Sequence, residues 1–187
     1  MKLGYAICGS FCTVPTSIRI LKKFTEDGHT VVPIMSLNAG KTDTRFGTAE
    51  YVRKQVEDLC GRKIVETLTD AEPLGPREPL DALLVCPCTG NTLAKLANGI
   101  TDTPVTLVVK AHLREDRPLV IALATNDAMS ANLGNIGTML NRKNVFFVPM
   151  KQDDPVKKPH SLVFEPTLVA ETLKSAVNSR QIYPLFL

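Results

Sequence analysis

Small polar residues stand directly after four apolar runs of the sequence, where backbone amides and hydroxyls can bind an anion. Small side chains let a ligand approach the backbone N–H groups closely, and Ser and Thr add hydroxyl donors. A helix N-terminus behind each turn adds partial positive charge. This combination predicts a site for a phosphate monoester. The candidate residues are Gly9, Ser10, Ser36, Thr89, Asn91 and Thr92.

Each of these turns has a simpler interpretation when it is taken alone, because Ser, Thr and Asn are common helix N-caps. Thr89 to Thr92 would then only cap the helix that follows. Four such turns at neighbouring strand ends favour a binding site instead. The dinucleotide fingerprint G-x-G-x-x-G and the P-loop G-x-x-x-x-G-K-[ST] are both absent, which disfavours NAD or a nucleoside triphosphate in this chain.

The cysteines near these turns could hold a metal or act as nucleophiles. Cys86 and Cys88 are two apart on a strand end and are expected on the same side of it, with Cys8 and Cys12 nearby. Four thiols can form a zinc site, but C-x-C with C-x-x-x-C is not the usual ligand spacing, so packing is favoured and no metal is expected. Cys12 is the candidate reactive thiol, because helix N-termini lower a thiol pKa.

The elements that position these residues alternate along the chain. Continuous apolar strands separated by helices predict a parallel sheet covered on both faces. We therefore expect an α/β fold with a doubly wound, flavodoxin-like sheet of order 2-1-3-4-5, a Rossmann-type three-layer sandwich, as a single domain over residues 1–187. The segments 69–79 and 150–160 are expected to be loops. The expected strands are Tyr5–Cys8, Thr30–Met35, Leu80–Cys86, Leu119–Leu123 and Val145–Val148.

Composition narrows the class of protein. The chain has 187 residues, a formal net charge of +3 and no long Lys/Arg run, so neither nucleic acid nor a membrane surface is expected as a partner. Five cysteines without small-scaffold spacing fit a reducing compartment. The N-terminal apolar stretch is too short for a membrane span and lacks a cleavage pattern, which predicts a cytoplasmic protein.

Three motifs give the chain a resemblance to the flavoprotein family, which includes phosphopantothenoylcysteine decarboxylase and other flavin-containing cysteine decarboxylases. C-P-C-T-G-N-T-L-A-K-L-A-N-G-I-T-D, residues 86–102, resembles the family's P-A-S/T-A-N-T motif and its helix. Gly9-Ser10 matches the first phosphate loop. Leu123 to Met129 falls where the family has P-x-M-N-x-x-M, and Asn126 and Met129 are retained.

The resemblance implies a site that holds FMN, with Asn126 as the catalytic residue that orients a substrate carboxylate. The decarboxylases carry a catalytic histidine in the segment that corresponds to residues 71–76, and none is present here, which argues against cysteine decarboxylation. The implied cofactor-binding residues are Gly9, Ser10, Phe11, Ser36, Thr89, Gly90, Asn91 and Thr92.

Two longer stretches, residues 72–107 and 152–163, are similar to a subfamily that makes dipicolinate in the mother cell of spore-forming bacteria. That similarity implies oxidation of a dihydrodipicolinate-level dicarboxylate, with NADP held by a partner A subunit that supplies the nucleotide-binding domain. A homo-oligomer is also implied. Two alternatives stay open: a non-catalytic assembly or channelling subunit, and a decarboxylase or flavin prenyltransferase of the same family.

Overall fold

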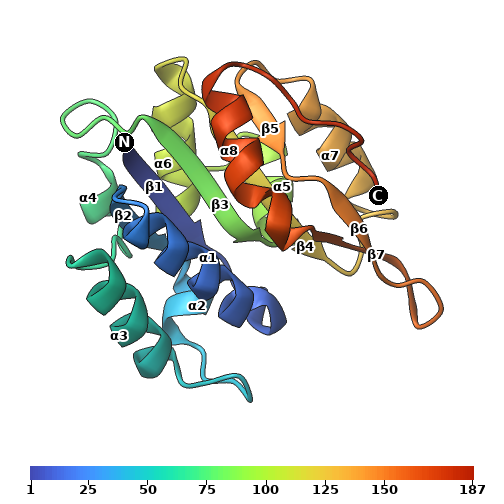
Figure 1. Cartoon of the computed structure of the whole chain (residues 1–187), viewed down its shortest axis with the longest axis horizontal. Helices are drawn as coiled ribbons and strands as arrows, with labels where there is room; N and C mark the ends of the chain where they lie inside the picture. The colour runs from blue at the N-terminus through green and yellow to red at the C-terminus, as the bar shows by residue number, and fades with distance from the viewer.

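A mixed sheet with helices on both faces forms the molecule, which the computed structural model describes over residues 1–187 (Figure 1). The strand order is β2-β1-β3-β4-β7-β6, and β5 also pairs with β4. The first four strands and β5 are parallel, which confirms the predicted 2-1-3-4-5 arrangement and the fold class. The strands are β1 (Lys2–Ile7), β2 (Thr30–Met35), β3 (Ala82–Cys88), β4 (Leu119–Thr125), β5 (Val145–Phe147), β6 (Met150–Asp154) and β7 (Lys158–Phe164).

Helices bury their apolar stripes against both faces of the sheet. On one face α1 and α8 pack on Tyr5 and Leu84, while α5, α6 and α7 pack on the other face over Leu83 and Ile121. All seven residues of β3 are buried, because a central parallel strand is covered from both sides. The helices are α1 (Val14–Glu26), α2 (Leu37–Lys41), α3 (Ala49–Cys60), α4 (Leu68–Ala71), α5 (Gly90–Ala97), α6 (Pro104–Arg114), α7 (Leu133–Leu140) and α8 (Val169–Val177), with short 3₁₀ helices η1 (Phe11–Thr13) and η2 (Pro166–Leu168).

The segment 150–160 was expected to be a loop, and this prediction was wrong. It forms β6, a turn and the start of β7, and the turn is closed by the Asp154 carboxylate, which accepts from the N–H groups of Val156 and Lys157. β7 runs antiparallel to the end of β4, with Ala124 opposite Val163 and Thr125 opposite Leu162. The hairpin therefore extends the sheet beyond the carboxyl end of β4.

Two smaller expectations also changed. The segment 69–79 contains the end of α4 before its turns, so it is partly helical rather than a loop. Cys86 and Cys88 were expected on the same side, yet Cys86 packs with Leu84 and Cys88 packs with Val85 on the opposite face. The reason is a register shift between Val85 and Cys88, which interrupts the regular alternation of side chains along the strand.

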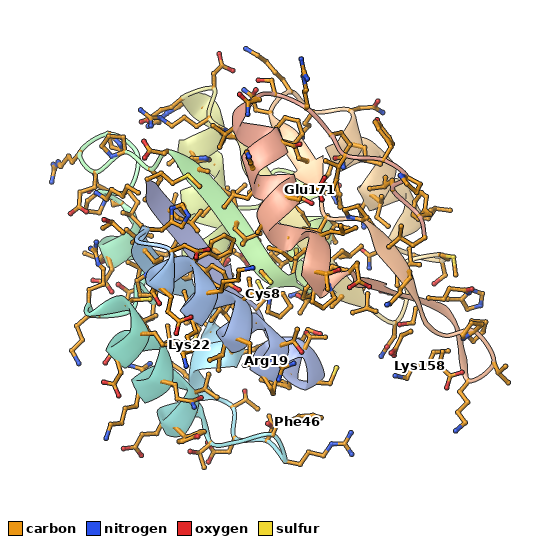
Figure 2. The ribbon with its side chains drawn as sticks, viewed as in Figure 1. Cys8, Arg19, Lys22, Phe46, Lys158 and Glu171 are labelled. Atoms are coloured by element: carbon orange, nitrogen blue, oxygen red, sulfur yellow. The ribbon has the colours of Figure 1, made fainter.

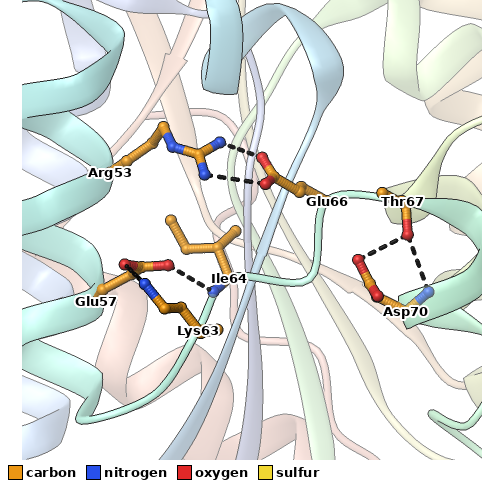
Figure 3. A network of polar contacts seen from close by, with 7 residues as sticks. All are labelled: Arg53, Glu57, Lys63, Ile64, Glu66, Thr67 and Asp70. Atoms are coloured by element: carbon orange, nitrogen blue, oxygen red, sulfur yellow. Dashed lines mark hydrogen bonds and ion pairs between the residues drawn. The ribbon is translucent and has the colours of Figure 1, made fainter.

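Ion pairs fasten α3 to the segment that leads away from it (Figure 3). Arg53 on α3 pairs through both guanidinium nitrogens with Glu66. Glu57 accepts from the Ile64 N–H at 3.2 Å and from Lys63 at 3.0 Å. The bidentate geometry suits a planar guanidinium, so this contact holds the α3 layer against the β2 side of the sheet.

The outer edge of β5 is covered by a side chain. Gln181, in the segment after α8, accepts from the Phe147 N–H at 2.8 Å and donates to the Phe147 carbonyl at 2.7 Å. Its amide thus makes both hydrogen bonds that a neighbouring strand would make.

Candidate functional site

A cleft of about 440 Å³ opens at the carboxyl ends of β1, β3 and β4, where ligands bind in doubly wound sheets. The volume is in the range of small-molecule sites, roughly 300–1,000 Å³. Phe46 and Lys158 border this opening from segments far apart in the sequence (Figure 2). The lining residues are Gly9, Ser10, Phe11, Cys12, Thr13, Phe46, Thr89, Gly90, Asn91, Ala124, Thr125, Asn126, Asp153, Lys158, Ser161, Leu162 and Val163.

We call the segments 9–13 and 89–91 the floor of the cleft. The N–H groups of Gly9, Phe11 and Cys12 make no hydrogen bond within the chain. The first N–H groups of α5, at Gly90 and Asn91, likewise have no partner within their helix. The floor therefore presents backbone donors and the positive end of a helix to the cleft, which is the donor set that a phosphate group requires.

Buried hydrogen bonds hold the two floor segments at a fixed separation. The Cys8 N–H donates to the Pro87 carbonyl at 3.1 Å, and the Thr92 hydroxyl donates to the Cys8 sulfur at 3.4 Å. The Ser17 hydroxyl on α1 donates to the Cys86 carbonyl at 2.5 Å and lies 3.0 Å from the Tyr5 hydroxyl. Because the ladder to β4 is irregular here, Ser17 supplies a partner at a carbonyl beside the register shift.

Gly90 begins α5 in a space that accepts no side chain. A Cβ at this position would lie 2.5 Å from both the Asn132 Nδ2 and the Thr125 Oγ1, and 2.9 Å from the Asp127 Oδ1. These groups form one cluster, in which Asp127 accepts from Thr125 at 2.6 Å and from Asn132 at 2.9 Å. The Thr125 and Asn132 hydrogen bonds lower the pKa of the Asp127 carboxyl, so the cluster carries a negative charge beneath the loop that holds Asn126.

We call the β6–β7 residues Asp153, Lys158 and Ser161 the wall of the cleft. Lys158 is paired with Asp153, and this contact raises the pKa of the Lys158 ammonium. Ser161 is 3% exposed and its hydroxyl lies 3.5 Å from the Asn126 Oδ1. The wall therefore contributes side chains of both charges and one buried hydroxyl, whereas the floor contributes backbone donors.

Most of the predicted site residues lie together in this cleft, and two do not. Gly9, Ser10, Phe11, Thr89, Gly90, Asn91 and Asn126 line it. Ser36 caps α2 by accepting from the Ala39 N–H at 3.3 Å, so its hydroxyl is engaged outside the lining. Thr92 is buried behind Thr89 with its hydroxyl on Cys8.

Sequence reasoning missed Phe46 and the wall. Asp153 and Lys158 come from a segment whose charged, exposed residues gave no strand signal, and Ser161 lies where β7 becomes buried. A hairpin signal was present in Asp154-Pro155, since Asp and Pro are typical turn residues between two runs. Phe46 follows α2 in a turn closed by the Thr44 and Gly47 hydrogen bonds, and no motif marks it.

The thiols differ sharply in access. Cys8, Cys86 and Cys88 are fully buried, and burial raises the pKa of Cys8 to about 11 and of Cys86 to about 12. Burial also raises the pKa of Cys88. Cys12 is exposed and lines the cleft. No cluster of three or more His, Cys, Asp or Glu side chains is arranged to hold a metal ion.

These features define a member of a known class: the chain belongs to the Flavoprotein family, whose model matches residues 1–166. This confirms the family predicted from the segment 86–102. The chain is 40% identical over 185 residues to the B subunit of dipicolinate synthase from Bacillus subtilis (strain 168), and the match covers 98% of this chain and 92% of that protein.

Solved structures agree with the sequence comparison. The B subunit of dipicolinate synthase from Bacillus halodurans has a TM-score of 0.91 and 35% identity, with 100% of this chain and 95% of that chain covered. The FMN-dependent cysteine decarboxylase SpaF has a TM-score of 0.69 and 20% identity, with 96% of this chain and 97% of that chain covered, and shares the fold. No helix here combines the length and apolar character needed to cross a membrane.

Proposed function

We propose that the chain is the B subunit of a dipicolinate synthase and binds FMN in the cleft, with the phosphate on the floor. The observation that carries this proposal is the set of unpaired N–H groups at Gly9, Phe11 and Cys12, facing the same cleft as the N-terminus of α5. The family match and the FMN-dependent relative of the same fold support it.

The floor residues would hold the phosphate through backbone amides, helped by the Ser10 hydroxyl. The Thr89 hydroxyl caps α5 instead, donating to the Thr92 hydroxyl at 3.0 Å and accepting from the Thr92 N–H at 3.2 Å. When bound, FMN would supply a carrier for two electrons between the substrate and a final acceptor. Asn126 lies at the opposite side of the opening from the floor's first loop, and its amide can donate to a substrate carboxylate without adding charge. Phe11 and Phe46 bring apolar surface to the cleft, which suits a planar ring system.

The reaction that fits this arrangement is oxidation of a dihydrodipicolinate-level intermediate to dipicolinate in the mother cell during sporulation. The oxidation removes a hydride and a proton, and NADP on the dipicolinate synthase A subunit is the final acceptor of the hydride. This chain lacks a dinucleotide fingerprint of its own, which fits that division. We further propose that the chain acts as a homo-oligomer together with the A subunit.

Comparison of FMN with riboflavin tests the floor directly, because the two ligands differ only in the phosphate. We expect wild-type protein to bind FMN at least about ten-fold more tightly than riboflavin, since hydrogen bonds to a charged group are worth about 1.5–3 kcal/mol. Flavin fluorescence during titration measures both affinities.

A negative charge introduced into the floor gives a second test of phosphate binding there. Ser10→Asp places a carboxylate at the phosphate position and should remove the preference for FMN while leaving riboflavin binding nearly unchanged. Ser130→Asp, at an exposed serine outside the lining, is the matched control. Equal binding of FMN and riboflavin by the wild type would show that no phosphate rests on the floor, and binding of neither would remove flavin from the proposal.

A non-catalytic subunit is the second candidate, and one observation favours it. The ionisable side chains that line the cleft are Cys12, Asp153 and Lys158, two of which pair with each other, and no histidine lines it. Assays of the A subunit with and without this chain separate the two candidates. Full dipicolinate formation by the A subunit alone would support the assembly role.

A further inference from the structure

Ser161 is a buried hydroxyl at the wall of the cleft with an incomplete set of hydrogen bonds. It is 3% exposed, and its partner within the chain is the Asn126 Oδ1 at 3.5 Å between the oxygens. That separation is well beyond the roughly 2.7–2.8 Å usual for an O–H···O hydrogen bond. Most buried side-chain hydroxyls in folded proteins have at least one hydrogen-bond partner, and the single partner of Ser161 is held at long distance, so this contact requires an explanation.

The main chain places the two residues opposite each other. β7 pairs antiparallel with the end of β4, where Thr125 lies opposite Leu162. Continuing that register by one residue sets Asn126 opposite Ser161. The pairing of the hairpin with β4 thus brings a serine from late in the sequence to the side chain of Asn126.

This contact favours one orientation of the exposed Asn126 amide and thereby the side of it that meets a ligand. The serine hydroxyl donates to the Oδ1, so the amide oxygen is engaged and the Nδ2 hydrogens are left for the cleft. A ligand that meets those hydrogens must accept hydrogen bonds, which is what a carboxylate does. Lys158, on the same strand and also lining the cleft, adds positive charge at the wall.

We propose that Ser161 is a positioning residue: it holds the Asn126 amide so that its N–H donors face the ligand, and it thereby selects a carboxylate. The Ser161–Asn126 contact tightens once a carboxylate occupies the site, as hydrogen bonds in unliganded sites often do. This inference rests on the proposed function, because it assigns the residue that orients Asn126 toward the dicarboxylate.

Calorimetric titration of the FMN-loaded protein with dipicolinate tests the inference, and FMN affinity is measured separately for every variant. Ser161→Ala should weaken dipicolinate binding about ten-fold, because the amide is free to turn, while FMN affinity is unchanged. Ser161→Thr keeps a hydroxyl in a residue suited to strands and should restore binding to near the wild-type value. Asn126→Asp should weaken it more than Ser161→Ala does, since a carboxylate would then face a carboxylate.

Gln152→Ala is the control for a general disturbance of the hairpin, because Gln152 lies on β6 opposite Leu162 and does not line the cleft. It should bind dipicolinate as the wild type does. Undiminished binding by Ser161→Ala or Asn126→Asp would overturn the inference while FMN binding stands. Wild-type protein that takes up FMN but no dipicolinate would overturn it as well, whereas failure to bind FMN would count against the proposed cofactor.

Discussion

The floor and the wall of the cleft are built by opposite means. The floor consists of main-chain amides at the ends of β1 and β3, two strands buried in the centre of a parallel sheet. The wall consists of side chains on an antiparallel hairpin, of which Asp153 and Lys158 are exposed and Ser161 is buried.

The floor and the wall can therefore recognise different parts of a ligand. Backbone donors that are fixed by the core cannot be changed by substitution without changing the fold, so they suit a group that never varies, such as a cofactor phosphate. Side chains on a hairpin can be exchanged at little cost in stability, so they suit the part of the ligand that distinguishes one enzyme from another.

The largest expected effect comes from breaking the floor at Gly90. Gly90→Ala places a Cβ 2.5 Å from two donors of the Asp127 cluster, and the start of α5 must shift to relieve the contact. We expect a loss of about 2–3 kcal/mol in the free energy of unfolding, together with loss of FMN binding. Urea denaturation and flavin titration measure the two effects.

Gly134→Ala is the matched control for this substitution. Gly134 also lies at the start of a helix, and a Cβ there meets nothing within 4 Å. It should be stabilised by about 0.5–1 kcal/mol, as expected for alanine replacing glycine in a helix. If the Gly90 variant is as stable as this control, the start of α5 can shift without loss of stability, which would contradict the prediction.

A smaller effect is expected where the floor segments are joined. Ser17→Ala removes the hydroxyl that donates to the buried Cys86 carbonyl and contacts Tyr5. An unsatisfied buried carbonyl costs about 1–3 kcal/mol, so the urea midpoint should fall and FMN affinity should fall with it. Ser130→Ala, at an exposed serine, should change stability by less than about 0.5 kcal/mol. Unchanged flavin affinity in the Ser17 variant would show that the Ser17–Cys86 hydrogen bond does not position the floor for FMN.

The smallest expected effect on stability is at the wall. Lys158→Ala removes an exposed partner of Asp153, so the urea midpoint should not move. Dipicolinate binding should weaken at low salt, and the difference from the wild type should vanish as added salt screens the charge. Lys151→Ala removes a lysine of the same hairpin that pairs with Glu165 outside the cleft. An equal effect in that control would attribute the change to net charge rather than to the wall.

The sheet was predictable because its strands are apolar without interruption. The segment 30–35 was predicted with the bounds that the structure has, and the strand order followed from the alternation of strands and helices. The hairpin was not predictable in this way, since β6 has one buried residue, Met150, and three exposed ones, and is held mainly by main-chain pairing. Periodicity reports burial, and little is buried there.

In the candidate site, too, one part could be predicted from the sequence and another could not. The floor could be predicted because small polar residues directly after apolar strands are visible in the sequence, as at Gly9 and Thr89. Ser161 could not, because its position opposite Asn126 depends on a pairing between segments far apart in the chain. The expectation for Cys86 and Cys88 failed because it treated the strand as regular. Pro87 between them was the available sign of the register shift, since proline inside a strand is typical of a bulge.

The Gln181 amide at the outer side of β5 prevents strand addition between molecules of this chain at Phe147. A three-residue strand with open hydrogen-bonding groups invites a strand from another molecule to add to the sheet. Here one carboxamide takes both groups of Phe147, so no intermolecular ribbon can grow from that position. The segment after α8 thereby blocks strand addition at Phe147, and any contact between copies of this chain would use other surfaces.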